Sequence, residues 1–254
     1  MEKIIHYCWF GKGEIPERDK KCMESWKKYL PDYTIMFWNE DTFPLEKYEF
    51  TRMAYECKKY AFVSDYVRVY ALYNYGGIYF DTDYMLLKDI SSLLGDEIVL
   101  GCENRHFVGT AIMAAPRYNS VCKKMLDYYN STRFIDNAGN HNEIPNTMIL
   151  TDILEDMGFV RGNEWKNNGI HVYPREVFFP KQSAEGKYEP TEKSVGIHYF
   201  NGSWWSEKER KRSKSKFYNQ IIRPVLRFGK NIIIKLLGKE KGRMIENTVK
   251  NKMR

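Results

Sequence analysis

The strongest constraint on the fold is a helix-forming stretch that ends at two glycines and leads into a short apolar strand. Residues 51–75 carry apolar side chains at helical spacing, and Gly76-Gly77 ends that pattern. Ile78-Tyr79-Phe80 then predicts a short buried strand, which Asp81-Thr82-Asp83 follows. Open α/β sheets bind ligands at the carboxyl ends of their strands, so we expect a polar site at these aspartates.

The segments around this stretch indicate a sheet whose first strands are parallel. Residues 3–10 predict a strand, 17–30 an amphipathic helix that ends before Pro31, and 33–38 a second strand. This order at short spacing is typical of a parallel α/β sheet. Further strands are expected at 98–102, 110–115, 170–173 and 195–199, with helices at about 120–129 and 146–157. Because no internal repeat or low-complexity linker interrupts the chain, we predict one domain over 1–206 and a tail over 207–254.

The composition indicates a folded, mildly acidic body with a basic tail. Residues 207–254 hold 16 Lys and Arg against 4 Asp and Glu, whereas the residues before them hold 24 and 29. The net charge of +7 therefore arises in the tail, which argues against a nucleic-acid groove over the body and for a tail that meets an anionic surface. The five cysteines contain no C-x-x-C pair and favour a reducing compartment. No segment resembles a signal peptide or a membrane span, so we expect a cytoplasmic protein.

The tripeptide Asp81-Thr82-Asp83 can present two carboxylates to one cation. On an extended backbone residues i and i+2 point to the same side, and hard oxygen ligands suit Mg²⁺ or Mn²⁺. An isolated D-x-D more often marks a turn or a solvated strand end, so the interpretation depends on its context. In Ser64-Asp65-x-x-Arg68 an acid and a guanidinium share one helix face just upstream. The alternative for this pair is an ordinary helical ion pair.

The run YAFVSDYVRVYALYNYGGIYFDTDYMLL resembles the D-x-D-containing sugar transferases of glycosyltransferase family 32, and it is similar to the catalytic core of the large clostridial glucosylating toxins. The motifs S-D-x-x-R, G-G-x-Y and D-x-D in fixed order carry this resemblance. IIHYCWFGKG resembles the opening strand of the family and IHYFNGSWW its closing element, so the resemblance covers roughly residues 3 to 205. It implies a GT-A fold, a Rossmann-like α/β domain with a mixed sheet flanked by helices. The resemblance does not cover the tail, which we expect to be helical and basic from its own sequence.

The resemblance also implies a retaining, metal-dependent hexosyltransferase whose donor is a nucleoside diphosphate sugar, with UDP preferred over GDP. Trp9 would stack on the nucleobase with Asn39 nearby, and Asp65 and Arg68 would hold the donor sugar or its diphosphate. No catalytic nucleophile is implied. The residues expected to act in catalysis are Asp65, Arg68, Asp81 and Asp83. The residues expected to bind the donor are Trp9, Asn39, Asp65, Arg68, Tyr79, Asp81, Ser203 and Trp204.

The metal set implied by the resemblance is Asp81, Asp83 and His198, with Asp83 as a direct ligand and Asp81 bound directly or through water. A neutral imidazole can complete a Mn²⁺ shell, although a lone histidine beside a strand is more often a satisfied core residue. The indole N–H of Trp204 can donate to a phosphate oxygen. His6 lies inside the first predicted strand, and we interpret it as structural.

The tail and the acceptor define the expected partners. Residues 217–238 alternate apolar clusters with Arg and Lys, which fits either a basic amphipathic helix on anionic lipid or a helix packed on the domain with a solvated basic face. The resemblance implies a glycan or lipid-linked acceptor in bacterial surface (capsular) polysaccharide synthesis. We therefore expect a peripheral protein at the inner face of the plasma membrane.

Two other functions share these features. A non-catalytic nucleotide-sugar or carbohydrate-binding module could keep the same fold, but such a module would not need Asp65, Arg68, Asp81 and Asp83 together. A metal-dependent phosphohydrolase could use the same D-x-D, but the sequence lacks the further acidic or histidine cluster that is usual for two-metal chemistry.

Overall fold

The computed structural model describes residues 1–95, 97–181 and 187–200, which belong to two units. The first unit comprises 1–133 and 144–201, and the described part of the second is 134–143. Within that short segment Ile135 and His141 form an antiparallel bridge, and the Asp136 carboxylate accepts a hydrogen bond from the backbone N–H of Asn140. Ser203, Trp204 and the tail at 207–254 lie outside the described residues, so the predicted boundary at residue 206 stays a prediction.

The described part of the first unit contains nine strands and six α-helices. The strands are β1 (Ile4–Cys8), β2 (Thr34–Trp38), β3 (Gly77–Phe80), β4 (Tyr84–Leu86), β5 (Ile98–Cys102), β6 (Val108–Ala115), β7 (Trp165–Asn167), β8 (Ile170–Tyr173) and β9 (Gly196–His198). The helices are α1 (Glu17–Tyr29), α2 (Glu49–Glu56), α3 (Tyr60–Tyr75), α4 (Ser120–Asn130), α5 (Asn146–Asp156) and α6 (Arg175–Phe178), and two 3-10 turns lie at Leu45–Lys47 and Ser91–Leu93. None of the described helices is both long and apolar enough to cross a membrane.

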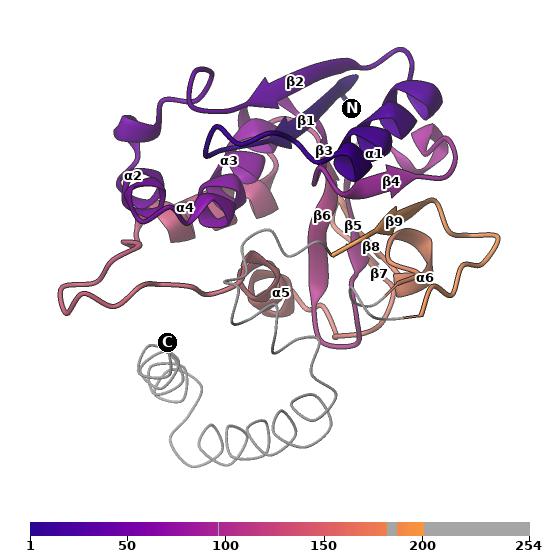
Figure 1. Ribbon diagram of the computed structural model, residues 1–254. Helices are drawn as coiled ribbons and strands as arrows, with labels where there is room; N and C mark the ends of the chain where they lie inside the picture. The colour runs from indigo at the N-terminus through magenta and orange to yellow at the C-terminus, as the bar shows by residue number, and fades with distance from the viewer. Residues whose placement is uncertain (96, 182–186, 201–254) are drawn as a thin grey trace, which may run out of the picture. The chain divides into compact units, whose positions relative to one another are not determined.

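Seven strands form one mixed sheet in the order β2-β1-β3-β6-β5-β8-β7. β1 runs parallel to β2 and β3, whereas β6 is antiparallel to both of its neighbours, β3 and β5. Helices α3 and α5 pack against one face of this sheet, and α1, α6 and the small β4–β9 pair lie at the other (Figure 1). This sheet flanked by helices confirms the expected α/β class with a mixed sheet, as in the GT-A fold.

Strand β3 lies between β1 and β6 and is buried along its whole length. Its apolar residues Ile78, Tyr79 and Phe80 are each at most 1% exposed, which explains why the sequence runs apolar without alternation. Gly77 starts the strand at φ +99°, and a Cβ atom there would lie 2.4 Å from the backbone oxygen of Ile4. Only glycine at position 77 allows β1 and β3 to approach this closely. Gly76 thus ends α3, and Gly77 begins the strand.

The predicted helix at 51–75 is wrong as one element, because it is two helices. α2 ends at Glu56 and α3 begins at Tyr60. Between them Lys58 has φ 56°, and the backbone N–H groups of Lys58 and Lys59 donate to the carbonyls of Tyr55 and Ala54, as in a helix end of the Schellman type. Both helices bury apolar faces, so the spacing of apolar residues does not reveal the break.

The predicted strand at 195–199 exists as β9, but it lies outside the main sheet. It pairs antiparallel with β4, with Tyr84 opposite His198 and Leu86 opposite Gly196. We did not predict β4 or β7, which are three residues each. The pairing brings residue 198 to the end of the D-x-D turn.

His6 is fully buried in β1 and both of its ring nitrogens have polar partners. Nε2 lies 2.8 Å from the Gly76 carbonyl oxygen, and the Trp38 indole N–H donates to Nδ1 over 3.1 Å. Since Nδ1 accepts, Nε2 carries the proton, and the ring is neutral. Burial lowers the pKa of His6 to about 4, although its hydrogen bond to Gly76 acts in the opposite direction.

We expect this buried imidazole to make the protein less stable in acid. The unfolded chain binds a proton at His6 near the ordinary histidine pKa of 6.5, whereas the folded chain resists it down to a pKa of about 4. The free energy of unfolding should therefore fall by roughly 3 kcal/mol between those pH values through this group alone. Urea unfolding of the wild type and of His6→Gln across that range measures it, because the variant should lose this part of the slope. His106→Gln, at an exposed position, is the control, and equal slopes in wild type and His6→Gln would contradict the assignment.

Candidate metal and donor site

The D-x-D motif lies on a turn directly after β3. The backbone N–H of Asp81 still donates to the Ala111 carbonyl of β6 over 2.8 Å, and the N–H of Tyr84 then donates back to the Asp81 carbonyl over 2.9 Å. The expectation that an extended backbone aligns the two carboxylates is therefore wrong. They come together because the chain turns between β3 and β4.

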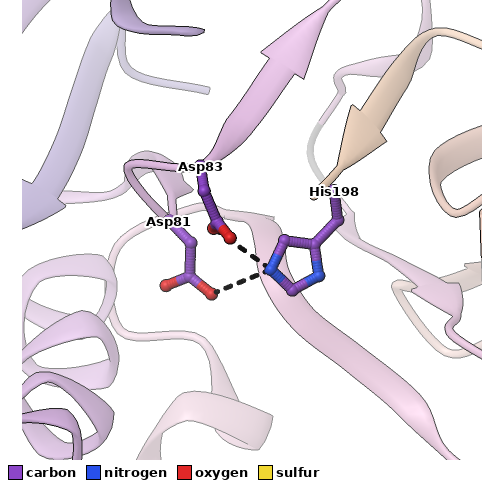
Figure 2. A group of neighbouring side chains, drawn as sticks. All are labelled: Asp81, Asp83 and His198. Carbon is purple, nitrogen blue, oxygen red and sulfur yellow. Dashed lines mark ion pairs between the residues drawn. The ribbon is translucent and has the colours of Figure 1, made fainter. Parts of the chain in front are cut away.

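His198 completes a cluster with both aspartates. Its Nε2 lies 3.2 Å from Asp83 Oδ1 and 4.0 Å from Asp81 Oδ2 (Figure 2). One ligand atom from each of the three side chains can be chosen so that all lie within 4.8 Å of one another. The structure thus brings together the residues that the sequence predicts as metal ligands, from segments 115 residues apart.

The charge state of His198 follows from the acids around it. Burial alone lowers the pKa of His198, but Asp83, Asp81 and Glu103 raise it, and the net direction is upward. The ring's other nitrogen, Nδ1, is buried and has no hydrogen-bond partner among the described residues. The polar interactions of this imidazole are thus directed through Nε2 toward the two aspartates.

Arg68 on α3 is the cation next to this cluster and is only 5% exposed. Its Nη1 donates to the Thr110 carbonyl over 2.7 Å and lies 3.2 Å from Asp81 Oδ1, and its Nη2 lies 3.0 Å from Asp65 Oδ1. Tyr79 adds a hydroxyl that donates to Asp81 Oδ1 over 3.0 Å and a ring whose centroid is 4.6 Å from the guanidinium carbon. The predicted residues Asp65, Arg68, Tyr79 and Asp81 therefore form one connected group.

Burial controls the electrostatics of this group. It raises the pKa of Asp65 to about 7, against the opposite effects of Arg68 and of a hydrogen bond from Asn146. For Arg68 burial acts to lower the pKa, but Asp81, Tyr79 and Asp65 outweigh it and keep the guanidinium charged. Loss of one partner from such a buried pair costs about 3–5 kcal/mol, because the other charge stays buried without compensation.

Trp9 and Asn39 lie after β1 and β2, at the edge of the sheet where β3 leads into Asp81. The Trp9 indole N–H donates to the Gly13 carbonyl over 2.6 Å, within its own loop. The Asn39 side-chain oxygen accepts from the backbone N–H groups of Asp41 and Thr42. Both side chains are thus held at the expected edge of the sheet by local bonds, and their contact with a nucleobase stays a prediction.

Several side chains near the site were not predicted from the sequence. Asp19 on α1 is 3% exposed and accepts a hydrogen bond from the Thr82 hydroxyl over 2.8 Å, which links α1 to the D-x-D turn. Asn146 on α5 donates to Asp65, and Glu103 lies close enough to His198 to contribute to the raised pKa of that imidazole. Asp19 stands in a helix rich in charged residues and Asn146 directly after a proline, so neither pattern distinguishes a site residue from a surface or capping residue.

Comparison with protein families identifies the segment that carries the site. Residues 16–100 match the family described as the glycosyltransferase sugar-binding region containing a DXD motif. That range includes Asp65, Arg68, Tyr79 and both aspartates of the motif. His198 lies beyond it.

Two curated relatives match this chain over about a third of their own length or less. The human lactosylceramide 4-alpha-galactosyltransferase is 33% identical over 124 residues, which are 46% of this chain and 32% of the relative. Inositol phosphoceramide mannosyltransferase 3 of Schizosaccharomyces pombe is 33% identical over 98 residues, which are 37% of this chain and 27% of the relative. The chain thus spans about a third of the length of these two relatives.

Among solved structures, the PaToxG glycosyltransferase superposes with a TM-score of 0.47 at 20% identity, over 62% of this chain and 69% of its own. A glycosyltransferase involved in glycosylation of the major capsid of PBCV-1 superposes with a TM-score of 0.46 at 13% identity, over 79% of this chain and 94% of its own. Residues 16–100 thus match the sugar-binding region of DXD-containing glycosyltransferases, which agrees with the resemblance predicted from the sequence.

Proposed function

We propose that this protein is a retaining, metal-dependent glycosyltransferase that moves a sugar from a nucleoside diphosphate sugar, with UDP preferred, to a glycan or lipid-linked acceptor. The convergence of Asp81, Asp83 and His198 beside the buried Arg68 carries the proposal. The acidic cluster suits a divalent ion that binds the diphosphate of the donor. The adjacent guanidinium and carboxylates suit the charge of the diphosphate and the hydroxyl groups of the sugar.

The side chains of the cluster fit a divalent metal. Two carboxylates and one imidazole are the donor set that suits Mn²⁺, and Mg²⁺ accepts the carboxylates. When bound, the ion would offset the negative charge that develops on the leaving diphosphate. Neighbouring side chains also fix the position of the cluster. Tyr79 and Arg68 contact Asp81, and Asp19 accepts a hydrogen bond from Thr82 in the D-x-D turn.

Arg68 and Asp65 would bind and orient the donor. Arg68 orients the carboxylates of Asp65 and Asp81 and adds positive charge near the leaving group, where preorganised charge is most effective in a water-poor site. Asp65 accepts hydrogen bonds from hydroxyl groups of the donor. For retention we propose attack of the acceptor on the face from which the diphosphate departs, with a diphosphate oxygen taking the acceptor proton, so no protein nucleophile is assigned.

The names of two relatives support a lipid-linked acceptor. Lactosylceramide and inositol phosphoceramide are glycolipids or phospholipids with an exposed polar head group, and those relatives are named for transfer to them. The basic tail of this chain, read from its sequence alone, is suited to anionic lipid. We propose that the acceptor is a lipid-linked glycan of a bacterial surface polysaccharide, reached at the inner face of the plasma membrane.

Replacement of Asp83 tests the metal mechanism. We expect Asp83→Ala to abolish sugar transfer and Mn²⁺-dependent donor binding while the protein stays folded, because the cluster loses one of its two carboxylates. Product analysis across a panel of nucleotide sugars, circular dichroism and titration calorimetry measure these effects. Asp127→Ala, which removes an exposed carboxylate on α4, is the matched control. Full activity of Asp83→Ala in EDTA would refute the mechanism, and donor binding without turnover by the wild type would support a binding module instead.

Proton competition at His198 predicts how metal binding depends on pH. The pKa of His198 is raised, so near neutral pH a proton occupies a fraction of Nε2, and Mn²⁺ must displace it. The apparent affinity for Mn²⁺ should rise with pH, by up to about tenfold per unit below that pKa. Calorimetric titration of Mn²⁺ between about pH 6 and pH 8 measures this. His198→Ala should bind more weakly with a flatter pH dependence, and an unchanged slope would remove His198 from the metal set.

The lipid role of the tail can be tested by flotation. Because residues 207–254 carry a net charge of about +12, we expect the full-length chain to float with vesicles that contain anionic phosphatidylglycerol. A chain that ends at Glu209 should stay in the dense fraction. Neutral phosphatidylcholine vesicles are the control, and equal flotation of the two chains would reject the membrane role of the tail.

A further inference from the structure

Asn146, the first residue of α5, lies between β6 and α3 with only 6% of its surface exposed. Its Nδ2 donates to Asp65 Oδ1 over 2.6 Å, and its Oδ1 accepts from the Thr110 hydroxyl over 3.0 Å. The match to the sugar-binding region ends at residue 100, so both Asn146 and Thr110 lie outside it.

The orientation of this amide follows from its neighbours. The NH₂ group of Asn146 faces Asp65 and its oxygen faces the Thr110 hydroxyl, which is the orientation that the ionised form of Asp65 requires, since an ionised carboxylate only accepts hydrogen bonds. The Thr110 carbonyl in turn accepts from Arg68 Nη1, and Arg68 Nη2 pairs with the same Asp65 oxygen that Asn146 contacts. The four residues close a ring of polar contacts that joins α3, β6 and α5.

This ring leaves one side of the Asp65 carboxylate for a ligand. Oδ1 receives both Asn146 and Arg68, whereas no hydrogen bond within the described residues ends on Oδ2. The Asp65 side chain is 13% exposed. A carboxylate oxygen repels a diphosphate and accepts from hydroxyl groups, so the ligand that Oδ2 suits is a sugar and not a phosphate.

We propose that Asn146 is a positioning residue for the donor sugar, which fixes Asp65 so that Oδ2 presents an acceptor to the sugar hydroxyls. Thr110 acts one step further back, by fixing the amide of Asn146. The inference rests on the proposed function, since it concerns the donor of that reaction. It places a determinant of sugar binding on α5, outside the segment that carries the recognised motifs.

Anchoring of α5 does not require this amide. Ile149, Leu150 and Leu154 on the same helix are each at most 5% exposed and hold it against its neighbours. A buried amide is costly unless its polar groups are paired, and an apolar residue at this position would pack without that cost. The polar side chain is therefore best explained by what it does to Asp65.

The test compares ligands that differ only in the sugar. We expect Asn146→Ala to weaken binding of the nucleotide sugar about tenfold, the effect of losing one charge-assisted hydrogen bond, while binding of the free nucleoside diphosphate changes less than about twofold. Titration calorimetry with Mn²⁺ measures both, with UDP, UDP-glucose, UDP-galactose, GDP and GDP-mannose as probes. Thr110→Val should have the same selectivity with a smaller effect. Ile149→Val, which loosens α5 without touching the ring, is the control and should bind both classes of ligand as the wild type does.

A second variant separates positioning from folding. Asn146→Asp keeps the shape of the side chain but places a second carboxyl group against Asp65. The two carboxyl groups can form a hydrogen bond only when they share a proton. With Arg68 and Asp81 also facing this pair, we expect sugar-dependent binding of the variant, relative to the wild type, to recover as the pH falls from about 8 to about 6. A mere packing defect would show no such recovery.

Each outcome decides a different question. Equal losses for nucleotide sugars and free diphosphates in Asn146→Ala, or no loss for either, overturn the positioning role and leave the proposed function intact. A wild type that binds free diphosphates but none of the nucleotide sugars overturns the proposed function together with this inference.

Discussion

The buried guanidinium of Arg68 is the interaction on which the site depends. It contacts the Thr110 carbonyl of β6, the Asp65 carboxylate one helical turn away on α3, and the Asp81 carboxylate after β3. A charge that is 5% exposed is tolerated only because these partners surround it. The same contacts set the position of α3 relative to the edge of the sheet. The requirement to compensate one buried charge therefore aligns the helix that carries Asp65 with the strand end that carries the D-x-D motif.

The order of the strands determines what meets at that edge. β3 is an interior strand, so the turn after it lies between the ends of β1 on one side and β6 on the other. β1 and β2 deliver Trp9 and Asn39 to that edge, and the pairing of β4 with β9 returns the chain so that His198 faces both aspartates. Segments far apart in sequence reach one place because the parallel strands β1, β2 and β3 end at the same edge of the sheet and the separate β4–β9 pair returns the chain to it.

The parts of this structure that the sequence predicts are those with local signatures. The strand at Ile78–Phe80 was predictable from a short apolar run after two glycines, and the group of Asp65, Arg68 and Asp81 from motifs in fixed order. The break at Lys58 was not, since a positive φ at a lysine leaves no pattern in the spacing of apolar residues. The roles of Asp19 and Asn146 were not predictable either, because each depends on a hydrogen bond across more than 60 residues, to Thr82 and to Asp65 respectively.

The acids of the cluster outnumber the positive charges beside them, which would favour the binding of a cation. The negative charge of Asp65 is compensated by Arg68 and by a hydrogen bond from Asn146. The same guanidinium also contacts Asp81, so it compensates only part of the negative charge of Asp81, Asp83 and Glu103. Like charges held close in a poorly solvated place favour the binding of any positive charge. The raised pKa of His198 is one expression of this field, since a proton on the imidazole relieves the same repulsion that a divalent ion would relieve. The acids that raise the pKa of His198 are the same ones that would attract a divalent ion, so replacing one of them should change the pKa of His198 and the affinity for a metal together.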